Sequence, residues 1–331
     1  MIQTAFLGDV VLSTPLLTAL AQRHGRVDVI TTPAAAPLLE GHPAVGDVIR
    51  YDKRGKDHGW TGLVQLAQSL RTREYTRAYL PHRSWRSGVL AWLAHIPERI
   101  GFTDGARLFY TTAVSRAHRG HEVERLLALA GVEAGDALPV TLPRSQEDEA
   151  AAVRWMADHD IADGFIALAP GSIWGTKRWP YYGDLAARLE GDIVIVGGPD
   201  DRSLGDDICQ TAGRHARNAA GALTLRASAA LLARASMLIT NDSAPLHLAT
   251  AAGTPIVAIF GPTVPGFGFG PRGAGDMVVQ RDELSCRPCS RHGPQRCPLG
   301  HHRCMRDVSV ETVLVAIEKT KNENVTRAAA E

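Results

Sequence analysis

Short apolar runs alternate with helix-period stretches along most of this chain of 331 residues, and this alternation limits its fold more than any other feature. The runs that we expect to form strands are residues 2–6, 27–31, 47–51, 77–80, 99–102, 165–169, 193–197, 237–240 and 255–260. The helical patterns between them cover 14–23, 62–72, 84–95, 121–130, 181–189, 201–212, 228–234 and 244–252. Strands that alternate with helices are typical of βαβ units on parallel sheets. The sequence therefore predicts an α/β protein.

A polar segment at 138–148 interrupts this pattern, and Pro139 and Pro143 stiffen it. At about 150 residues per domain, the length allows two domains. We therefore predict two Rossmann-like domains, residues 1–143 and 144–331. The second should end in an amphipathic helix over 308–319, with one apolar face made of Val310, Val313, Leu314 and Ile317.

Composition and charge exclude several classes of protein. Lys and Arg number 36 and Asp and Glu 35, a net charge of +1, which argues against nucleic-acid binding through gross positive charge. No apolar run reaches the roughly 18 residues of a membrane span. The first basic residue is Arg23, and Asp9 interrupts the apolar start, so the pattern of a signal peptide is missing. We expect a cytoplasmic protein.

The first stretch that could bind a ligand or catalyse a reaction follows the first expected strand and contains Gly8 and Asp9. Ligands bind at the carboxyl ends of strands in open α/β sheets, and glycine allows a close backbone approach there. An acid at this position could take a proton from an attacking hydroxyl. The alternative is structural, with Asp9 as a helix N-cap and Gly8 as a turn residue.

Two later strand-to-helix loops carry the groups that phosphate oxygens require. Residues 169–180 combine glycines and hydroxyls with Lys177 and Arg178, without the Walker or dinucleotide glycine patterns. Residues 240–249 place Ser243 where it can cap a helix whose dipole favours an anion, with His247 one turn further on the same face. The alternatives are a surface turn with solvated cations and an ordinary buried histidine.

Together these segments resemble glycosyltransferase family 9, the ADP-heptose:lipopolysaccharide heptosyltransferases, and in particular the heptosyltransferase II type. The matching motifs are LGDVVLSTP at 7–15, PGS at 170–172 with KRWP at 177–180, and NDSAPLHLA at 241–249 with FGPT at 260–263. They occur in order and span both halves of the chain.

The resemblance implies a GT-B fold, in which two Rossmann-like domains face each other across a cleft. Domain 1–143 would bind the acceptor and domain 144–331 the nucleotide sugar. The reaction would be inverting transfer of heptose from ADP-heptose to the inner core of lipopolysaccharide. Two alternatives remain: a GT-B enzyme with another nucleotide-sugar donor, and a non-catalytic nucleotide-sugar-binding protein.

By the same resemblance, Asp9 would be the catalytic base. The donor site would comprise Ser172, Thr176, Lys177, Asp201, Leu223, Asp242, Ser243, Ala244 and His247. Lys177 and Ser172 would hold the pyrophosphate. Leu223 would lie against the adenine, and Asp201 or its neighbour Asp200 would accept from the ribose. Lys177 and a helix N-terminus can neutralise a pyrophosphate without a cation, so we expect no catalytic cofactor.

Basic residues crowd the first domain, and they are either solvated surface charges or part of an acceptor groove. Arg54, Lys56, Arg83 and Arg86 are the residues that we expect to contact anionic core sugars. A groove of this kind would lie near the inner membrane, where each cation contributes about 1 kcal/mol. The predicted partners are therefore the donor, the core acceptor and, through peripheral contact, the cytoplasmic face of the inner membrane.

Four cysteines cluster near the end of the chain, at Cys286, Cys289, Cys297 and Cys304. The first pair has the spacing of metal ligands, but the second pair is wider than in zinc ribbons. Structural zinc, redox-labile thiols or a disulfide, and plain packing remain open as interpretations.

Overall fold

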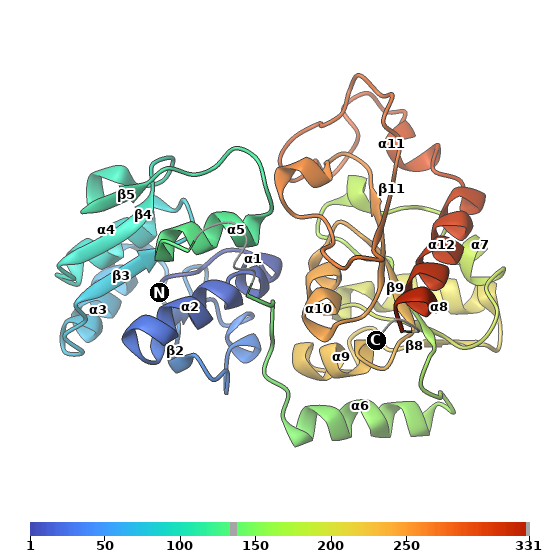
Figure 1. Cartoon of the computed structure of the whole chain (residues 1–331), viewed down its shortest axis with the longest axis horizontal. Coiled ribbons are helices and arrows are strands. Elements are labelled where there is room, and N and C mark those ends of the chain that lie inside the picture. The colour runs from blue at the N-terminus through green and yellow to red at the C-terminus, as the bar shows by residue number, and fades with distance from the viewer. Residues whose placement is uncertain (133–137, 329–331) are drawn as a thin grey trace. The chain divides into compact units, whose positions relative to one another are not determined.

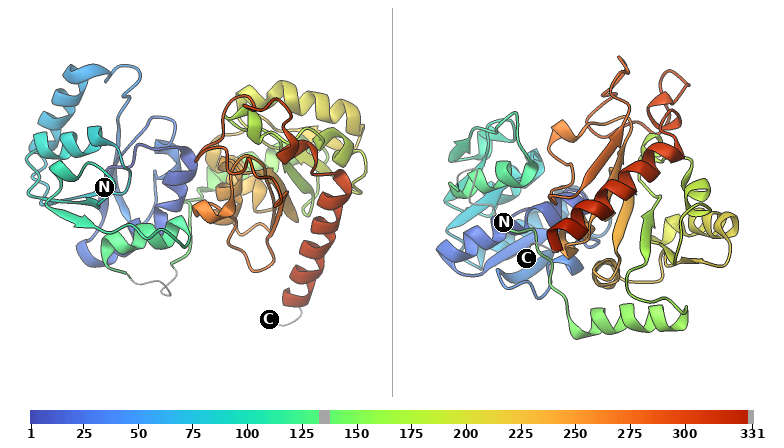
Figure 2. Two further views of the ribbon diagram at one scale, coloured as in Figure 1. Left: turned by 90° about the horizontal axis from the view of Figure 1, so that it is seen from above. Right: turned by 45° about the vertical axis from the view of Figure 1, so that its right-hand side comes forward.

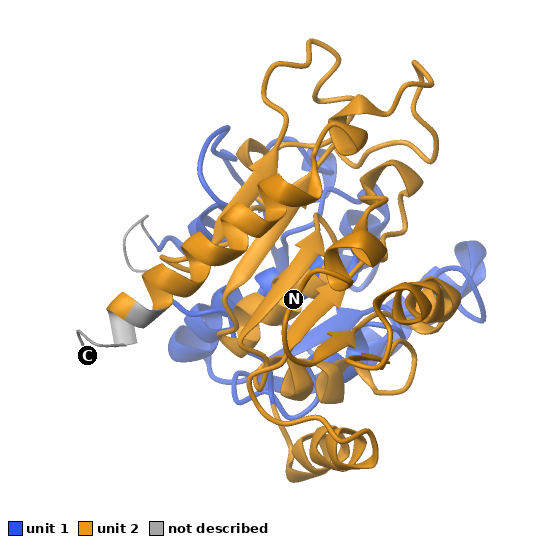
Figure 3. Ribbon diagram, turned by 90° about the vertical axis from the view of Figure 1, so that its right-hand side faces the viewer, with its two compact units in different colours: residues 1–143 blue, residues 144–331 orange. Residues whose placement is uncertain are grey.

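The structure, a computed structural model, describes residues 1–132 and 138–328. The chain forms two compact units, Met1–Pro143 and Arg144–Glu331, which are coloured separately in Figure 3. Each has its own sheet and its own core, and each is described by itself below.

The sheet of unit 1 is parallel and is completed by the first residues of the chain. Its strands are β1 (Val27–Thr31), β2 (Val45–Arg50), β3 (Arg77–Leu80), β4 (Glu98–Phe102) and β5 (Thr112–Val114). β1 pairs with β2, and β4 lies between β3 and β5. Ile2 bridges β1 at Ile30, and its amide donates to the Tyr79 carbonyl of β3 at 2.9 Å. The spatial order β2-β1-Ile2-β3-β4-β5 is the Rossmann order.

The strand expected at 2–6 was predicted too long, since only Ile2 forms a bridge. The chain is extended as far as Phe6 and then enters helix α1 (Leu7–Leu12) directly. Phe6 is the N-cap of α1, and Asp9 lies inside its first turn. The interpretation of Asp9 as an N-cap is therefore wrong.

The remaining helices of unit 1 follow their strands in the βα pattern and cover the sheet (Figure 1). They are α2 (Thr14–His24), α3 (Gly59–Arg71), α4 (Trp85–Leu93) and α5 (Glu122–Leu127), with short 3-10 turns η1 (Ala36–Leu38), η2 (Arg107–Phe109) and η3 (Ala128–Ala130). The buried faces of α3 and α4 share a core with β3, in which Leu63, Leu80 and Leu90 are almost wholly inaccessible.

Unit 2 contains a larger sheet with the same strand order. Its strands are β6 (Ile166–Ala169), β7 (Ile193–Ile195), β8 (Ala216–Asn218), β9 (Met237–Asn241), β10 (Ile256–Phe260) and β11 (Met277–Gln280). They are parallel and lie in the order β11-β10-β9-β6-β7-β8. Every residue of β6, β7, β9 and β10 is buried, as expected of central strands covered on both faces.

Helices lie on both faces of this sheet, as the two further views show (Figure 2). They are α6 (Gln146–Asp158), α7 (Tyr182–Ala186), α8 (Arg202–Ala212), α9 (Leu225–Leu232), α10 (Ala244–Ala252), α11 (Arg303–Arg306) and α12 (Val310–Ala328), with 3-10 turns η4 (Gly175–Lys177), η5 (Pro199–Asp201) and η6 (Pro265–Phe267). The sequence pattern missed α6. A capping box begins this helix: Ser145 Oγ accepts from the Asp148 amide at 3.1 Å, and the Asp148 carboxylate accepts from the Ser145 amide at 3.0 Å.

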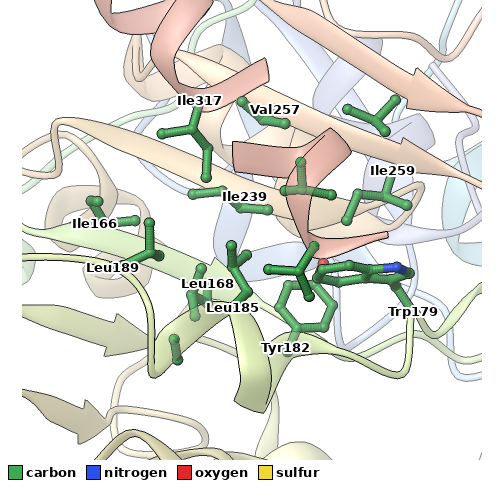
Figure 4. Close-up of a cluster of buried hydrophobic side chains, with 14 of the residues drawn as sticks. Ile166, Leu168, Trp179, Tyr182, Leu185, Leu189, Ile239, Val257, Ile259 and Ile317 are labelled. Atoms are coloured by element: carbon green, nitrogen blue, oxygen red, sulfur yellow. The ribbon is translucent and has the colours of Figure 1, made fainter. Parts of the chain in front are cut away.

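The core of unit 2 lies between the sheet, α7 and the final helix α12, and Figure 4 shows its central side chains. Trp179 and Tyr182 pack edge to face with their ring centroids 5.2 Å apart. Trp179 Nε1 also donates to the Val308 carbonyl at 2.8 Å, which fixes the chain just before α12. The terminal amphipathic helix is confirmed, because Val313 and Ile317 are fully buried on one face. None of the described helices combines the length and apolar character of a membrane span.

Candidate active site

Asp9 lies where the carboxyl end of the central Ile2 segment turns into α1. Burial raises the pKa of Asp9 to about 6, and the nearby Glu122 carboxylate acts in the same direction. A hydrogen bond from the Phe6 backbone and the charge of Arg116 act against this shift. At neutral pH the carboxyl group is therefore ionised but is a stronger base than an ordinary aspartate, which suits it to accept a proton.

A buried ion-pair group lies beside Asp9 and was not predicted from the sequence. Glu122, the first residue of α5, accepts from both Arg116 and Arg125, the latter at 3.4 Å. The Arg116 guanidinium also lies over the Phe102 ring, 4.6 Å from its centroid. All three charged side chains are at most one-tenth exposed. This group joins the start of α5 to the carboxyl edge of the sheet next to Asp9.

Lys53 and His82 lie at the same edge of the sheet. Lys53 carries a positive charge, and His82 has a buried polar atom. Lys53 Nζ donates to the Thr4 carbonyl at 2.7 Å, at the end of the Ile2 segment. Burial, together with the charges of Lys53, Arg116 and Arg83, lowers the pKa of His82 to about 4. Within the described part of the chain, His82 Nδ1 is buried and has no hydrogen-bond partner. A neutral imidazole among cations can contact an anionic or hydroxyl ligand.

The four predicted acceptor residues divide into three kinds. Arg54 and Lys56 are exposed on the loop before α3. Arg83 is also exposed, but it pairs with Asp104 at 2.6 Å. Arg86 donates to Tyr51 Oη and to the Gly59 carbonyl, both at 2.5 Å. Arg86 therefore fastens the start of α3 to α4, and its interpretation as a solvated surface charge is wrong.

In unit 2 the predicted donor residues gather around a buried ion pair at the carboxyl ends of β6, β9 and β10. Lys177 Nζ lies 2.6 Å from Asp242 Oδ2, and each side chain is about one-tenth exposed. Thr263 Oγ1 donates to the same carboxylate oxygen at 2.6 Å. The sequence singled out Lys177 and Asp242 separately, 65 residues apart, but did not predict their contact.

The loop that carries Lys177 is held by its neighbours on both sides. Ser172 Oγ accepts from the Trp174 amide at 3.2 Å, and the Thr176 hydroxyl donates to the Pro294 carbonyl. Asn241, which the sequence did not select as a site residue, accepts from the Trp179 amide at 3.2 Å and donates to the Pro170 carbonyl at 2.7 Å. These contacts fix the position of Lys177 before any ligand binds.

Ser243 stands at the N-terminus of α10 but does not cap it as expected, because its side chain makes no capping hydrogen bond. Among the residues that the structure describes, its Oγ is buried without a partner. Ala244 begins the helix, and His247 lies one turn further, buried, with its ring 6.2 Å from that of Phe269. A buried hydroxyl beside a helix N-terminus and a lysine is suited to bind phosphate oxygens.

Asp201 and Leu223 lie further along the same edge. The Asp201 carboxylate accepts from the Gly198 amide at 3.0 Å and approaches Gly171 so closely that a Cβ there would lie 2.2 Å from Oδ1. Leu223 is half-buried in the turn before α9. Gly221 makes that turn possible: its φ is +69°, and a side chain would contact Pro199 at 2.7 Å.

The cysteine segment packs beside this loop. All four cysteines are free thiols, and among the described residues no group of three or more His, Cys, Asp or Glu side chains is arranged to hold a metal. The backbone of the segment instead supports the site: the Cys289 amide donates to the Pro262 carbonyl at 2.9 Å, and Gln295 Oε1 accepts from the Gly175 amide at 3.1 Å. These contacts join the cysteine segment to the loop that carries Lys177 and to the turn after β10.

Two Rossmann-ordered units, one with a buried acid and the other with a phosphate-type loop, define a glycosyltransferase of the GT-B class. The family model for glycosyltransferase family 9 (heptosyltransferase) matches residues 63–298, and the chain belongs to this family. It is an enzyme that transfers a sugar.

Named relatives agree with this membership. The chain is 30% identical over 289 residues to lipopolysaccharide heptosyltransferase 2 of Salmonella typhimurium, covering 80% of this chain and 82% of the relative. Among solved structures, a family 9 glycosyl transferase from Veillonella parvula is similar with a TM-score of 0.86 and 26% identity, covering 97% of this chain and 96% of that one. ADP-heptose lps heptosyltransferase II of E. coli shares the fold with a TM-score of 0.77 and 24% identity, covering 98% of both chains.

Proposed function

We propose that this protein transfers heptose from ADP-heptose to the inner core of lipopolysaccharide, with inversion at the anomeric carbon. Two kinds of support converge on this function. Its full-length relatives carry the name heptosyltransferase. The observation that carries the donor assignment is the buried Lys177–Asp242 pair beside the unpartnered hydroxyl of Ser243.

The donor would bind in unit 2. Its diphosphate oxygens would accept hydrogen bonds from the Lys177 ammonium, the Ser243 hydroxyl and the backbone amides of Ser243 and Ala244. At this end of α10 the helix dipole favours negative charge. Ser172 and Thr176 would shape the loop around it, and His247 and Asp242 would line the sugar side. Leu223 would lie against the adenine, and Asp201, whose carboxylate packs against Gly171, would accept from the ribose.

The chemical step would use Asp9 as general base. Its carboxylate would take the proton of an acceptor hydroxyl as that oxygen forms a bond to the anomeric carbon. The bond from this carbon to the diphosphate oxygen would break, and ADP would leave with the electron pair. Lys177 and the α10 N-terminus would stabilise the charge that develops on the departing diphosphate. These groups are cationic enough that we propose no metal cofactor.

The acceptor would bind in unit 1, where Arg54, Lys56 and Arg83 would meet its anionic core sugars and Arg86 would hold the loop in place. Because the core is built on a lipid anchor, we infer that the enzyme meets it at the cytoplasmic face of the inner membrane. Replacing Arg54 and Lys56 together by Ala should raise the acceptor KM by roughly ten-fold. Arg77→Ala, at the amino end of β3, is the matched control and should leave it unchanged.

A donor-dependent transfer assay tests the whole proposal. Purified protein is incubated with core oligosaccharide lacking the heptose and with ADP-heptose or UDP-linked sugars, with and without EDTA. We expect transfer from ADP-heptose alone, at the same rate in EDTA. Transfer from a uridine-linked donor would assign another GT-B activity, and donor binding without turnover would indicate a binding protein.

A further inference from the structure

Four large apolar side chains of unit 1 are exposed to solvent on neighbouring elements. Trp60, the second residue of α3, is 62% exposed. Trp85 and Trp92 on α4 are 54% and 53% exposed, and Leu108 in η2 is 96% exposed. We call these four residues the tryptophan surface. Exposed apolar patches of this kind mark interaction sites, because water solvates large aromatic rings poorly.

Ring contacts join Trp60 to Trp85 and Trp92 to η2, and one face of α4 connects the two pairs. The Trp60 and Trp85 rings have centroids 5.9 Å apart. Trp92 follows Trp85 by seven residues on the same face of α4, and its ring lies 6.2 Å from that of Phe109, the neighbour of Leu108. Helices α3 and α4 lie side by side in Figure 1, which agrees with this continuity.

The charges around the tryptophan surface are predominantly positive. Arg54, Lys56 and Arg107 are exposed, and no side-chain hydrogen bond or ion pair involves them within the described ranges. The acidic groups nearby are already engaged. Asp52 accepts from the Gly55 amide at 2.8 Å, and Asp57 accepts from the Asp52 amide at 2.8 Å. Asp104 is paired with Arg83.

We propose that the tryptophan surface and these three cations bind the surface of an anionic phospholipid bilayer. Tryptophan is enriched where headgroups meet acyl chains, and arginine and lysine beside it are attracted to anionic lipid. A protein partner would fit the aromatic rings equally well, but the five cations Arg54, Lys56, Arg83, Arg86 and Arg107 outnumber the three carboxylates Asp52, Asp57 and Asp104, and this favours a bilayer. This inference rests on the proposed function, since it supplies the contact with a lipid-anchored acceptor.

The tryptophan surface lies near the carboxyl edge of the unit 1 sheet, where we propose that the acceptor binds. Arg86 directly follows Trp85 and donates to the Gly59 carbonyl, immediately before Trp60. The same Arg86 lies close enough to Lys53 to lower the pKa of Lys53. Lipid bound at Trp60 and Trp85 would therefore border the carboxyl edge of the unit 1 sheet, where the acceptor sugars are to react.

Vesicle flotation tests the proposal directly. Wild-type protein should float with vesicles of phosphatidylethanolamine and phosphatidylglycerol and should not float with phosphatidylcholine alone. The double variant Trp60→Ser/Trp85→Ser should lose at least about ten-fold in vesicle affinity. Leu108→Ser should weaken binding several-fold without affecting folding, because Leu108 is almost wholly exposed. The matched control Leu299→Ser, on an exposed residue of unit 2, should bind as wild type does.

Measurements of activity and of oligomeric state distinguish membrane binding from the binding of a protein partner, including a second copy of this chain. Leu108→Ser should transfer heptose to lipid-free core oligosaccharide at the wild-type rate and more slowly to acceptor embedded in vesicles. Equal flotation of wild type and both variants would overturn the proposal. So would a wild-type dimer in light scattering that Leu108→Ser splits while flotation stays unchanged. If no heptose is transferred but flotation still depends on Trp60 and Trp85, the proposed function fails and the membrane surface stands.

Discussion

The two units share one strand order but differ in how the charges at the carboxyl edge of each sheet are balanced. In unit 2 the Lys177 ammonium already has an anionic partner, Asp242, and a hydroxyl from Thr263 completes the group. In unit 1 Arg116 is paired with Glu122, but among the described residues Lys53 has no carboxylate partner and lies near a neutral His82. The topology fixes where each site lies, whereas its side chains decide whether charge is balanced before a ligand arrives.

This difference agrees with the different tasks that we propose for the two edges. The balanced group of unit 2 is ready to exchange one anion for another, as diphosphate binding requires. Unit 1 combines a raised Asp9 pKa with positive charge, as acceptor binding and proton removal require. Four predictions test this division, from the largest expected effect to the smallest.

Asp9→Ala should lower turnover by roughly 10² to 10⁴, the usual range for the loss of a general base. ADP affinity should stay near the wild-type value, because Asp9 belongs to unit 1. Steady-state kinetics at saturating donor and acceptor, together with calorimetry of ADP binding, measure both quantities. Wild-type turnover in the variant would remove Asp9 from the mechanism.

Lys177→Ala, which changes the edge of unit 2, should weaken ADP binding. A lost charge-assisted contact is worth about 1.5 to 3 kcal/mol, or roughly ten- to hundred-fold in affinity. Arg188→Ala is the matched control, since Arg188 pairs with Glu311 on the surface of unit 2 at 2.5 Å. If calorimetry gave the same ADP affinity for Lys177→Ala and Arg188→Ala, unit 2 would not use Lys177 for the diphosphate.

The pH dependence of turnover should report the environment of Asp9. With a pKa of about 6, the base is protonated and inactive at lower pH. Turnover should therefore fall by about ten-fold per pH unit below 6 and level off above 7. A profile that stays flat down to pH 5 would contradict this assignment.

Asp9→Asn should stabilise the protein at pH 8 while abolishing transfer. Because the folded-state pKa lies above the unfolded value of 3.8, the contribution of Asp9 to stability is greatest below pH 3.8 and is lost as pH rises through about 6. Removing the charge should recover on the order of 1 to 3 kcal/mol in the free energy of unfolding at pH 8. Thermal unfolding at pH 8 and pH 5 tests this: the gain should be clearly smaller at pH 5, and an equal gain at both values would point to another cause.

The central strands could be predicted from sequence because their residues are uniformly apolar. β9 and β10 are buried at every position, and their expected ranges differ from the observed ones by a single residue. The edge strands β5, β8 and β11 were missed because each has a neighbour on one side only and retains exposed or half-buried residues. Their short, mixed patterns do not differ from those of loops.

The site was predictable in its parts but not in its contacts. Glycines, hydroxyls and cations after strands indicated the loops of Lys177 and Ser243. The pairing of Lys177 with Asp242 depends on how β6 and β9 lie side by side, which no local pattern encodes. Glu122 was missed for the same reason, since burial and neighbouring charge, not residue type, set it apart.

The carboxylate of Asp242 acts as a tethered competitor for every ligand that would use Lys177. A compound with a single weak negative charge gains little there, because it only replaces an ion pair that already exists. A diphosphate brings more charge and more oxygen atoms, so it can win the exchange. If Lys177 holds the diphosphate as proposed, Asp242 would take the ammonium back when the nucleotide leaves, which should shorten the residence of the product. In ligand screening, neutral fragments should therefore gain nothing from this lysine, and dianionic groups are the chemistry to pursue.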